Sequence, residues 1–309
     1  MKKQQAIKLG LTTLSLLVLT ACGGGGGGGG GGGSADNNQA APINPATTTP
    51  AVETPSTPAP EKPEDTFTLP AANGGGFKYN FNHSKATDVQ AITTAGNIQK
   101  IQVDGKTLSI IPNTYGLISP NINLSTLWQS DGKVMVCCGT KENIDSVKTG
   151  FVLDGEIAYA FYHGLKTLEN EMPKTGTAIY KGNDTAQLYT LSDGLQGPIY
   201  YENPQNPDVI RYATGNVEIV ADFGNKTIDG GLYQKGNDLP LVLLTGDIRG
   251  VDIVGTSVLN VNEREIETWQ VGDRLTAPLT GAFFGENAKE IAGEAHNGKW
   301  GVVFAAGKQ

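Results

Sequence analysis

From Phe67 onward, short runs rich in Val, Ile, Thr, Tyr and Phe alternate with Asp-Gly, Asn-Gly, Gly-Asn and Pro turns. Because β-branched and aromatic residues favour strands and these dipeptides favour tight turns, the spacing is typical of an antiparallel β protein. Helix signals are scarce, since the two best candidates, 143–147 and 286–290, are too short to show a helical period. The sequence therefore predicts an all-β fold.

The clearest strand and turn lie at 215–232. Four apolar residues of 215–223 share one face, with polar residues between them: Val217, Ile219, Ala221 and Phe223. This period of two marks a half-buried strand, in which Val220 is the one apolar residue on the polar face. Gly224-Asn225 then turns the chain into 226–232, which completes a hairpin.

A second hairpin is predicted near the C-terminus, where 290–295 and 300–304 flank Asn297-Gly298. Both turn residues tolerate positive φ, which favours a type I′ turn. The second strand places three large side chains on one face: Trp300, Val302 and Phe304. With about seven to nine strand candidates over 172–309, this part of the chain can close a small barrel that its own side chains fill.

The segment before the barrel has fewer strand candidates, longer loops and Trp128. We interpret 66–170 as an N-terminal β handle domain and 171–309 as a C-terminal antiparallel β-barrel domain. Together they are long enough to bury a substantial core.

Residues 1–21 have the form of a secretory signal, with Lys2 and Lys3 at the start, an apolar run over 9–19 and small residues directly before Cys22. Leu-Thr-Ala-Cys is a lipobox, which presents the cysteine thiol for acylation and cleavage. A transmembrane anchor is the alternative, but about 11 apolar residues are too few for the roughly 20 that span a bilayer. We therefore expect lipid attachment at Cys22.

Residues 22–65 combine an unbroken glycine tract, 23–33, with a stretch rich in Pro, Thr, Ala, Asn and Gln. Neither part holds enough apolar surface to offset the entropy of ordering it, so a disordered tether is predicted. A phosphate-binding glycine loop would need a strand before the tract and a helix after it, and the sequence has neither. As a coil of about 45 residues, the tether reaches roughly 35 to 40 Å.

Cleavage before Cys22 removes three lysines and no acid, so the formal net charge of −8 becomes −11. An acidic chain without a basic run repels phosphate backbones, which argues against nucleic acid as a partner. The sequence also lacks a G-x-S-x-G elbow, an H-E-x-x-H motif and a phosphate loop, and it has only three histidines. We therefore predict a binding protein and not an enzyme.

Two adjacent cysteines, Cys137 and Cys138, remain once Cys22 carries lipid. An exported compartment is oxidising and favours a vicinal disulfide, although adjacent residues fit ordinary disulfide geometry poorly. Both thiols packing at a strand end is the alternative, and it stays open. No His or Cys spacing supplies further ligands, so no metal site is predicted.

Direct haem binding would need an axial ligand, for which histidine is the usual residue. His83 and His163 lie beside aromatic residues in the handle, where a haem face could stack. For both, an ordinary loop or strand histidine is the alternative. His296 alternates with Glu294 on the face expected to point outward, so we expect it to be solvated. Apart from haem, no cofactor is expected.

Capture of a protein needs aromatic anchors on exposed loops with a polar rim. Four aromatic residues fall in turn-rich stretches and are candidates for that role: Tyr115, Trp128, Tyr200 and Tyr201. Core or edge packing is the alternative for each.

The barrel domain of transferrin-binding protein B-like surface lipoproteins resembles four stretches of this chain: EMPKTGTAIYKG (171–182), GNVEIVADFGNKTIDGGL (215–232), LTGDIRGVDIVGTS (244–257) and LTGAFFGENAKEIAGEAHNGKWGVVFAAGKQ (279–309). That family includes haemoglobin-haptoglobin utilisation lipoproteins, haemophilins and factor H-binding proteins. The order, spacing and C-terminal position of the stretches agree with the family, and the glycine tract resembles its tethers.

The resemblance implies a handle domain plus an eight-stranded barrel, displayed on the outer leaflet of the outer membrane. The name-giving protein carries two such lobes and this chain has room for one, so we expect a single-lobe member. Single-lobe relatives capture different host molecules, and the identity of the partner therefore does not carry over.

The first functional hypothesis is a receptor for a host serum protein that carries iron or haem, of the transferrin or haemoglobin type, which passes its cargo to an outer-membrane receptor channel. The second is immune evasion, in which the same scaffold binds the complement regulator factor H or factor I. Direct haem binding is a third, and a structural envelope lipoprotein is a fourth, against which the long tether argues. Surface display also implies an export partner.

Overall fold

The computed structural model describes residues 69–82, 85–112, 128–137, 144–190, 212–234, 236–268 and 272–309. All of them lie in one compact unit. Several predicted features fall outside these residues: the signal segment 1–21, the tether 22–65 with Cys22, and His83, Tyr115, Cys138, Tyr200 and Tyr201.

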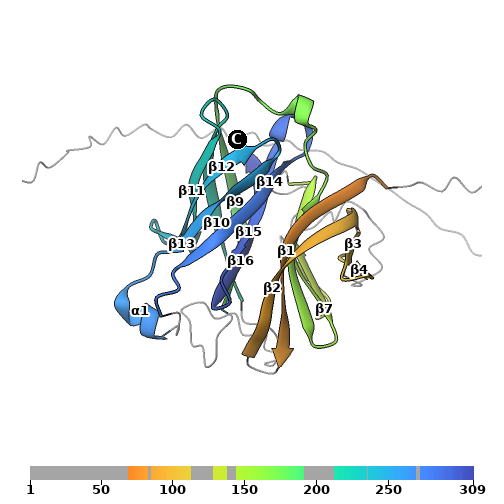
Figure 1. Cartoon of the computed structure of the whole chain (residues 1–309), viewed down its shortest axis with the longest axis vertical. Helices are drawn as coiled ribbons and strands as arrows, with labels where there is room; N and C mark the ends of the chain where they lie inside the picture. The colour runs from red at the N-terminus through yellow and green to blue at the C-terminus, as the bar shows by residue number, and fades with distance from the viewer. Residues whose placement is uncertain are drawn as a thin grey trace, which may run out of the picture. The chain divides into compact units, whose positions relative to one another are not determined.

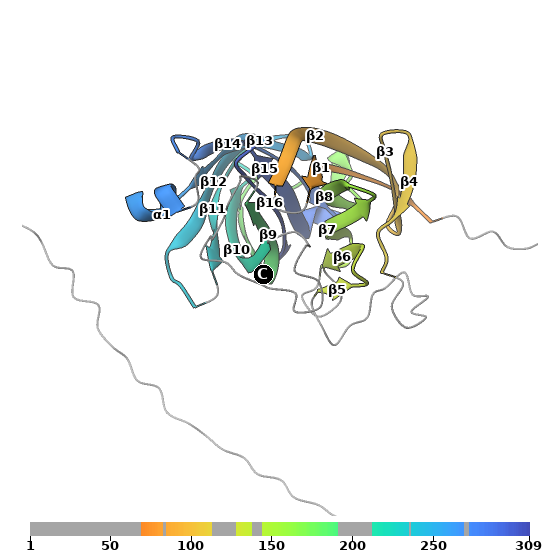
Figure 2. The same cartoon turned by 90° about the horizontal axis from the view of Figure 1, so that it is seen from below.

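Eight antiparallel strands of the C-terminal part close into a barrel (Figures 1 and 2). These strands are β9 (Thr177–Thr190), β10 (Tyr212–Asp222), β11 (Thr227–Gln234), β12 (Pro240–Arg249), β13 (Asp252–Leu259), β14 (Thr276–Phe284), β15 (Glu290–His296) and β16 (Trp300–Lys308). Closure comes from β9, which pairs with β10 on one side and with β16 on the other. The predicted fold class, an eight-stranded barrel after a β handle, is confirmed.

Apolar side chains from alternate positions of each strand fill the barrel interior. All four residues predicted to share the inner face of 215–223 are buried there, whereas Val220 on the opposite face is 40% exposed. Trp300, Val302 and Phe304 of β16 belong to the same interior cluster. The two strand predictions are therefore confirmed.

The turn between β15 and β16 differs from the predicted type I′ turn. Gly298 has a φ of 81°, but Asn297 is not among the residues with positive φ. Asn297 instead closes the turn, because its N–H donates to the carbonyl of Trp300 at 3.1 Å and its Oδ1 accepts the N–H groups of Lys299 and Trp300. The turn therefore spans 297–300, with Gly298 as its first central residue. Positive φ at this position alone is typical of a type II′ turn, which favours glycine there.

The handle is a second antiparallel sheet of eight strands, in the order β4-β3-β2-β1-β8-β7-β6-β5. Its strands are β1 (Ala71–Asn82), β2 (Lys85–Asn97), β3 (Lys100–Val103), β4 (Lys106–Ser109), β5 (Gln129–Ser130), β6 (Val134–Cys137), β7 (Val147–Asp154) and β8 (Ile157–Gly164). The expectation of fewer strands in this segment is wrong. Strands such as β6 and β8 are buried on both faces, so their sequences lack the alternation by which a strand is recognised.

Helical segments are short. The helix α1 spans Glu263–Thr268 between β13 and β14, and two 3-10 turns cover Glu169–Glu171 and Glu286–Ala288. No prediction was made for α1, because six residues are too few to show a helical period. Among the described residues, no helix is long and apolar enough to cross a membrane.

Candidate binding site

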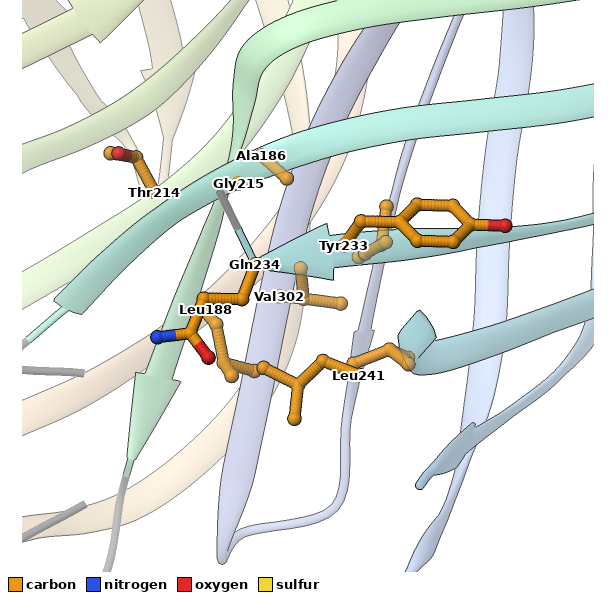
Figure 3. A pocket seen from close by; sticks show the side chains of 10 residues that line it. Ala186, Leu188, Thr214, Gly215, Tyr233, Gln234, Leu241 and Val302 are labelled. Atoms are coloured by element: carbon orange, nitrogen blue, oxygen red, sulfur yellow. The ribbon is translucent and has the colours of Figure 1, made fainter. Parts of the chain in front are cut away.

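A small apolar cavity lies at the end of the barrel where β9 ends and β10 begins. It holds about 20 Å³, which is room for about one water molecule. Its lining is apolar except for Thr214, Tyr233 and Gln234. In Figure 3, Leu188, Gln234 and Leu241 lie together, while the ring of Tyr233 extends away from them. The cavity is too small for a cofactor or a drug-sized ligand.

An open cleft of about 420 Å³ lies beside this cavity and shares Tyr233 with it. Most of its other lining residues are polar: Lys181, Asn183, Asn216, Glu218, Asn237 and Asp238. Irregular pairing accompanies the cleft, because the β9–β10 register shifts between Gly215 and Val217 and the β11–β12 register shifts at Leu232/Tyr233. Bulges of this kind redirect side chains and are common beside functional sites.

Hydrogen bonds hold several polar groups of the cleft in place. The ammonium of Lys181 lies 2.9 Å from a carboxylate oxygen of Glu218. The Oδ1 atom of Asn216 accepts the N–H of Asp184, also at 2.9 Å. Leu239, in the loop next to Asp238, is 69% exposed. The cleft thus offers hydrogen-bond donors and acceptors to solvent, and an exposed apolar side chain follows it in the sequence.

Sequence reasoning missed this cleft, although a signal was present. The tetrapeptide Lys-Gly-Asn-Asp occurs twice, at 181–184 and 235–238. Residues of both copies line the cleft, so the fold brings the repeated motif together from β9 and from the loop before β12. A search for short internal repeats would have paired these two positions.

The handle packs on the outer face of the barrel through an aromatic cluster. The ring of Phe77 in β1 lies 5.7 Å from that of Tyr189 in β9 and 5.0 Å from that of His296 in β15. Val303 of β16 belongs to the same cluster. We call this contact between the handle and the outer faces of β9 and β14–β16 the joint.

The joint corrects the expectation that His296 is solvated. The His296 side chain is 17% exposed and that of Glu294 is 5% exposed, and Nδ1 lies 2.9 Å from a Glu294 carboxylate oxygen. Both side chains point outward from the barrel, as expected, but the handle covers this part of the barrel's outer face. Sequence periodicity locates a face and does not say what lies against it.

His163, a candidate haem ligand, lies in the interior of the handle. Its side chain is fully buried, Nδ1 is 2.9 Å from the Thr94 hydroxyl and Nε2 is 3.0 Å from the Asn97 carbonyl. Burial lowers the pKa of His163 to about 4, against the hydrogen bond to Asn97, so the ring is neutral at physiological pH. Both ring nitrogens are engaged within the protein, and iron ligation would require breaking one of these contacts.

Trp128, a candidate anchor, is half-buried and packs against the apolar clusters of the joint. Its indole Nε1 donates to the carbonyl of Asp184 in β9 at 2.8 Å. The residue therefore links the handle to the strand that carries the polar cleft.

Cys137, at the end of β6, is buried and disulfide-bonded. Among the described residues, no group of three or more His, Cys, Asp or Glu could hold a metal ion.

Comparison with known proteins places the barrel in a family. Residues 172–308 match the family described as the C-lobe and N-lobe beta barrels of Tf-binding protein B. Transferrin-binding protein B of Neisseria meningitidis serogroup B is 24% identical over 234 residues, which cover 71% of this chain and 37% of that protein. An uncharacterized protein of Haemophilus influenzae is 29% identical over 70% of this chain and 68% of its own length.

The fold is shared with a solved structure. Isotype 1 transferrin binding protein B from serogroup B Neisseria meningitidis superposes with a TM-score of 0.52 at 20% identity, over 77% of this chain and 43% of that chain. The match thus spans 37% of the curated Neisseria meningitidis protein and 43% of the solved one.

Proposed function

We propose that this chain binds a host serum protein that carries iron or haem, of the transferrin or haemoglobin type, because its barrel is similar to the barrels of transferrin-binding protein B. The observation that carries the proposal is the match of residues 172–308 to the barrel of transferrin-binding protein B. The polar cleft beside Tyr233 and the exposed Leu239 supply the contact surface. Partner recognition through such a surface needs no cofactor and no catalytic group.

The proposal includes the placement of the protein. The lipobox at Cys22 attaches the chain to the outer membrane, and the tether 22–65 carries the handle (66–170) and the barrel (171–309) away from the lipid surface. An export partner moves the lipoprotein to the cell surface, and a receptor channel takes up the cargo. Tyr115, Tyr200 and Tyr201 remain candidates for loop anchors, and Cys137 with Cys138 for a vicinal disulfide.

Direct binding of the purified full chain to immobilised host proteins tests the proposal. The panel contains iron-loaded human transferrin, iron-free transferrin, haemoglobin, haemoglobin-haptoglobin, factor H and factor I, measured by biolayer interferometry at physiological salt. Saturable binding to one of the iron or haem carriers is the expected result. Binding to factor H or factor I alone would replace the proposal with the immune-evasion alternative, and a blank panel would remove both.

The role of the cleft is tested separately with one charge reversal and its matched control. Lys181→Glu places two acidic groups side by side with Glu218, whereas Lys308→Glu makes the same change at an exposed position outside the cleft. Carrier binding should weaken at least about tenfold in the first variant, as for loss of a contact worth about 1.4 kcal/mol, and stay unchanged in the second. Equal affinities in the two variants would exclude the cleft as the contact surface.

Direct haem binding stays a separate prediction. Titration of haem into wild-type protein, His83→Ala and His163→Ala distinguishes it, because loss of an axial histidine changes the Soret band. Spectra that are the same for all three proteins would remove both histidines as ligands.

A further inference from the structure

Two carboxylates of β15, Glu290 and Glu294, point outward from the barrel and lie under the handle. Both are buried, at 0% and 4% exposed. Glu294 is bonded within the barrel, to the Thr280 hydroxyl of β14 at 2.8 Å and to His296 of its own strand at 2.9 Å. Glu290 is bonded across the joint. This difference makes the two residues a natural comparison.

The Glu290 carboxylate accepts three successive backbone N–H groups from the segment that enters β7. The Asp145 N–H donates to Oε1 at 3.1 Å, the Ser146 N–H donates to both oxygens at 3.0 and 2.9 Å, and the Val147 N–H donates to Oε2 at 3.0 Å. A single side chain, 143 to 145 residues away in sequence, thus satisfies the backbone amides at the start of β7. Without it, these amides would need water or loop partners.

Charges of both signs surround this carboxylate. Lys289 lies 2.5 Å from Asp145 and 3.6 Å from Glu290, so it connects the two acids. Lys148 is only 2% exposed, and the nearby carboxylates of Glu290 and Asp145 both favour its charged form. Its cross-strand partner in β8 is His163. On the barrel side, β14 and β16 place Phe284 and Gly307 opposite Glu290.

We propose that Glu290 is the positioning residue that fastens the handle to the barrel, and that this attachment tightens as the pH falls from neutral toward 5. The geometry supports the first part: removal of the carboxylate leaves three N–H groups unsatisfied at a buried joint. The proposal holds whichever host protein the chain binds.

The direction of the pH effect follows from what the joint does to each titrating group. Burial, with Asp145 next to it, raises the pKa of Glu290 from 4.5 to about 7, against the opposing effects of the Ser146 N–H and Lys289, so the attached state binds more protons between these two values. Attachment is therefore favoured as the pH falls through this window and levels off below 4.5. The neighbouring titratable groups either change charge outside this pH window or affect contacts other than the one that Glu290 makes.

Three neighbours of Glu290 change charge outside this window. Burial lowers the pKa of Lys148 to about 8, so its effect appears above that pH. Although burial opposes both shifts, the contacts among Asp145, Lys289 and Glu290 lower the pKa of Asp145 to about 2 and raise that of Lys289. His163 titrates between about 4 and 6.5, but on its contacts with Thr94 and Asn97.

Hydrogen exchange of the full chain, followed by mass spectrometry, reads the amides of Asp145, Ser146 and Val147 directly. After correction for intrinsic exchange, the ratio of the protection at pH 5 to the protection at pH 7.5 should be at least about tenfold larger in wild-type protein than in Glu290→Gln, which corresponds to one unit of a pKa difference. Glu290→Gln keeps the shape and one acceptor without a titrating group, so its protection should not vary in the same way with pH. His163 is present in both proteins, and its contribution cancels in the comparison.

Glu290→Ala and Glu294→Ala test the fastening itself. The first should raise exchange at 145–147 by about tenfold or more at both pH values, because it leaves three buried N–H groups without their acceptor; tenfold corresponds to about 1.4 kcal/mol. The second should leave these amides protected, and β10–β13 should stay protected in both, which shows that the barrel is folded. A wild-type pH profile in Glu290→Gln, or equal effects of the two alanine variants, would overturn the proposal.

Discussion

The barrel and the handle each contain eight antiparallel strands, but only the barrel closes. Every barrel strand has two partners, so its backbone groups are paired along both sides. The handle ends at β4 and β5, which are four and two residues long. Short edge strands limit pairing with other chains. One face of the handle also packs on the barrel through the joint, so the open sheet depends on the closed one for part of its core.

The largest expected effect tests whether the barrel is a self-contained core. Trp300→Ala empties a fully buried position in the barrel interior and removes the indole N–H bond to the Arg274 carbonyl. The free energy of unfolding should fall by about 3–5 kcal/mol, as for other large-to-small changes in a core. Chemical denaturation followed by tyrosine fluorescence measures this, with Val220→Ala on the exposed face as control. A loss below 1 kcal/mol in Trp300→Ala would mean that the interior is not packed as described.

The contrast between the barrel and the handle also explains which parts of the fold could be predicted from the sequence. The barrel strand β10 faces a dry interior on one side and solvent on the other, so 215–223 showed its inner face by alternation alone. Handle strands such as β6 lie between two apolar clusters and show no alternation, so their number was underestimated. The covered position of His296 depends on contact between segments more than 200 residues apart, which no local pattern reports. None of the residues that line the polar cleft was predicted as a site residue; Trp128, predicted as an anchor, instead donates to the Asp184 carbonyl in the strand that carries the cleft.

Acid should loosen the handle core before it affects the barrel. Burial lowers the pKa of His163 from 6.5 to about 4, so the unfolded state binds more protons between these values. Stability from His163 is therefore complete above pH 6.5 and is lost as the pH falls through about 4, up to about 3 kcal/mol in total. Hydrogen exchange of β8 and β2 at pH 7 and pH 4.5 measures the loss, with β10–β13 as internal reference.

A non-titrating variant separates this effect from general acid sensitivity. His163→Gln retains a donor and an acceptor near Thr94 and Asn97 but binds no proton. Its handle should lose less protection between pH 7 and pH 4.5 than the wild-type handle. Equal losses in the two proteins would assign the acid sensitivity to other groups.

A smaller effect is expected where the two regions are linked by one hydrogen bond. Trp128→Phe keeps an aromatic ring in the joint but removes the N–H that donates to Asp184. Because the carbonyl of Asp184 then loses a partner, the free energy of unfolding should fall by about 0.5–1.5 kcal/mol. Thermal unfolding followed by circular dichroism checks this value. A loss larger than that of Trp300→Ala would show that the joint, and not the barrel interior, limits stability.

The smallest effect concerns the polar cleft, where the barrel is exposed and the handle does not cover it. Lys181 and Glu218 form an ion pair 2.9 Å apart with side chains about half exposed. Exposed pairs contribute about 0–1 kcal/mol, so Lys181→Ala should change the free energy of unfolding by less than about 0.5 kcal/mol. Denaturation of the two proteins side by side measures the difference. Since the fold is then unaltered, any loss of carrier affinity in Lys181→Ala reports on the contact surface alone. A clear loss of stability would instead give Lys181 a structural role and remove it as a probe of binding.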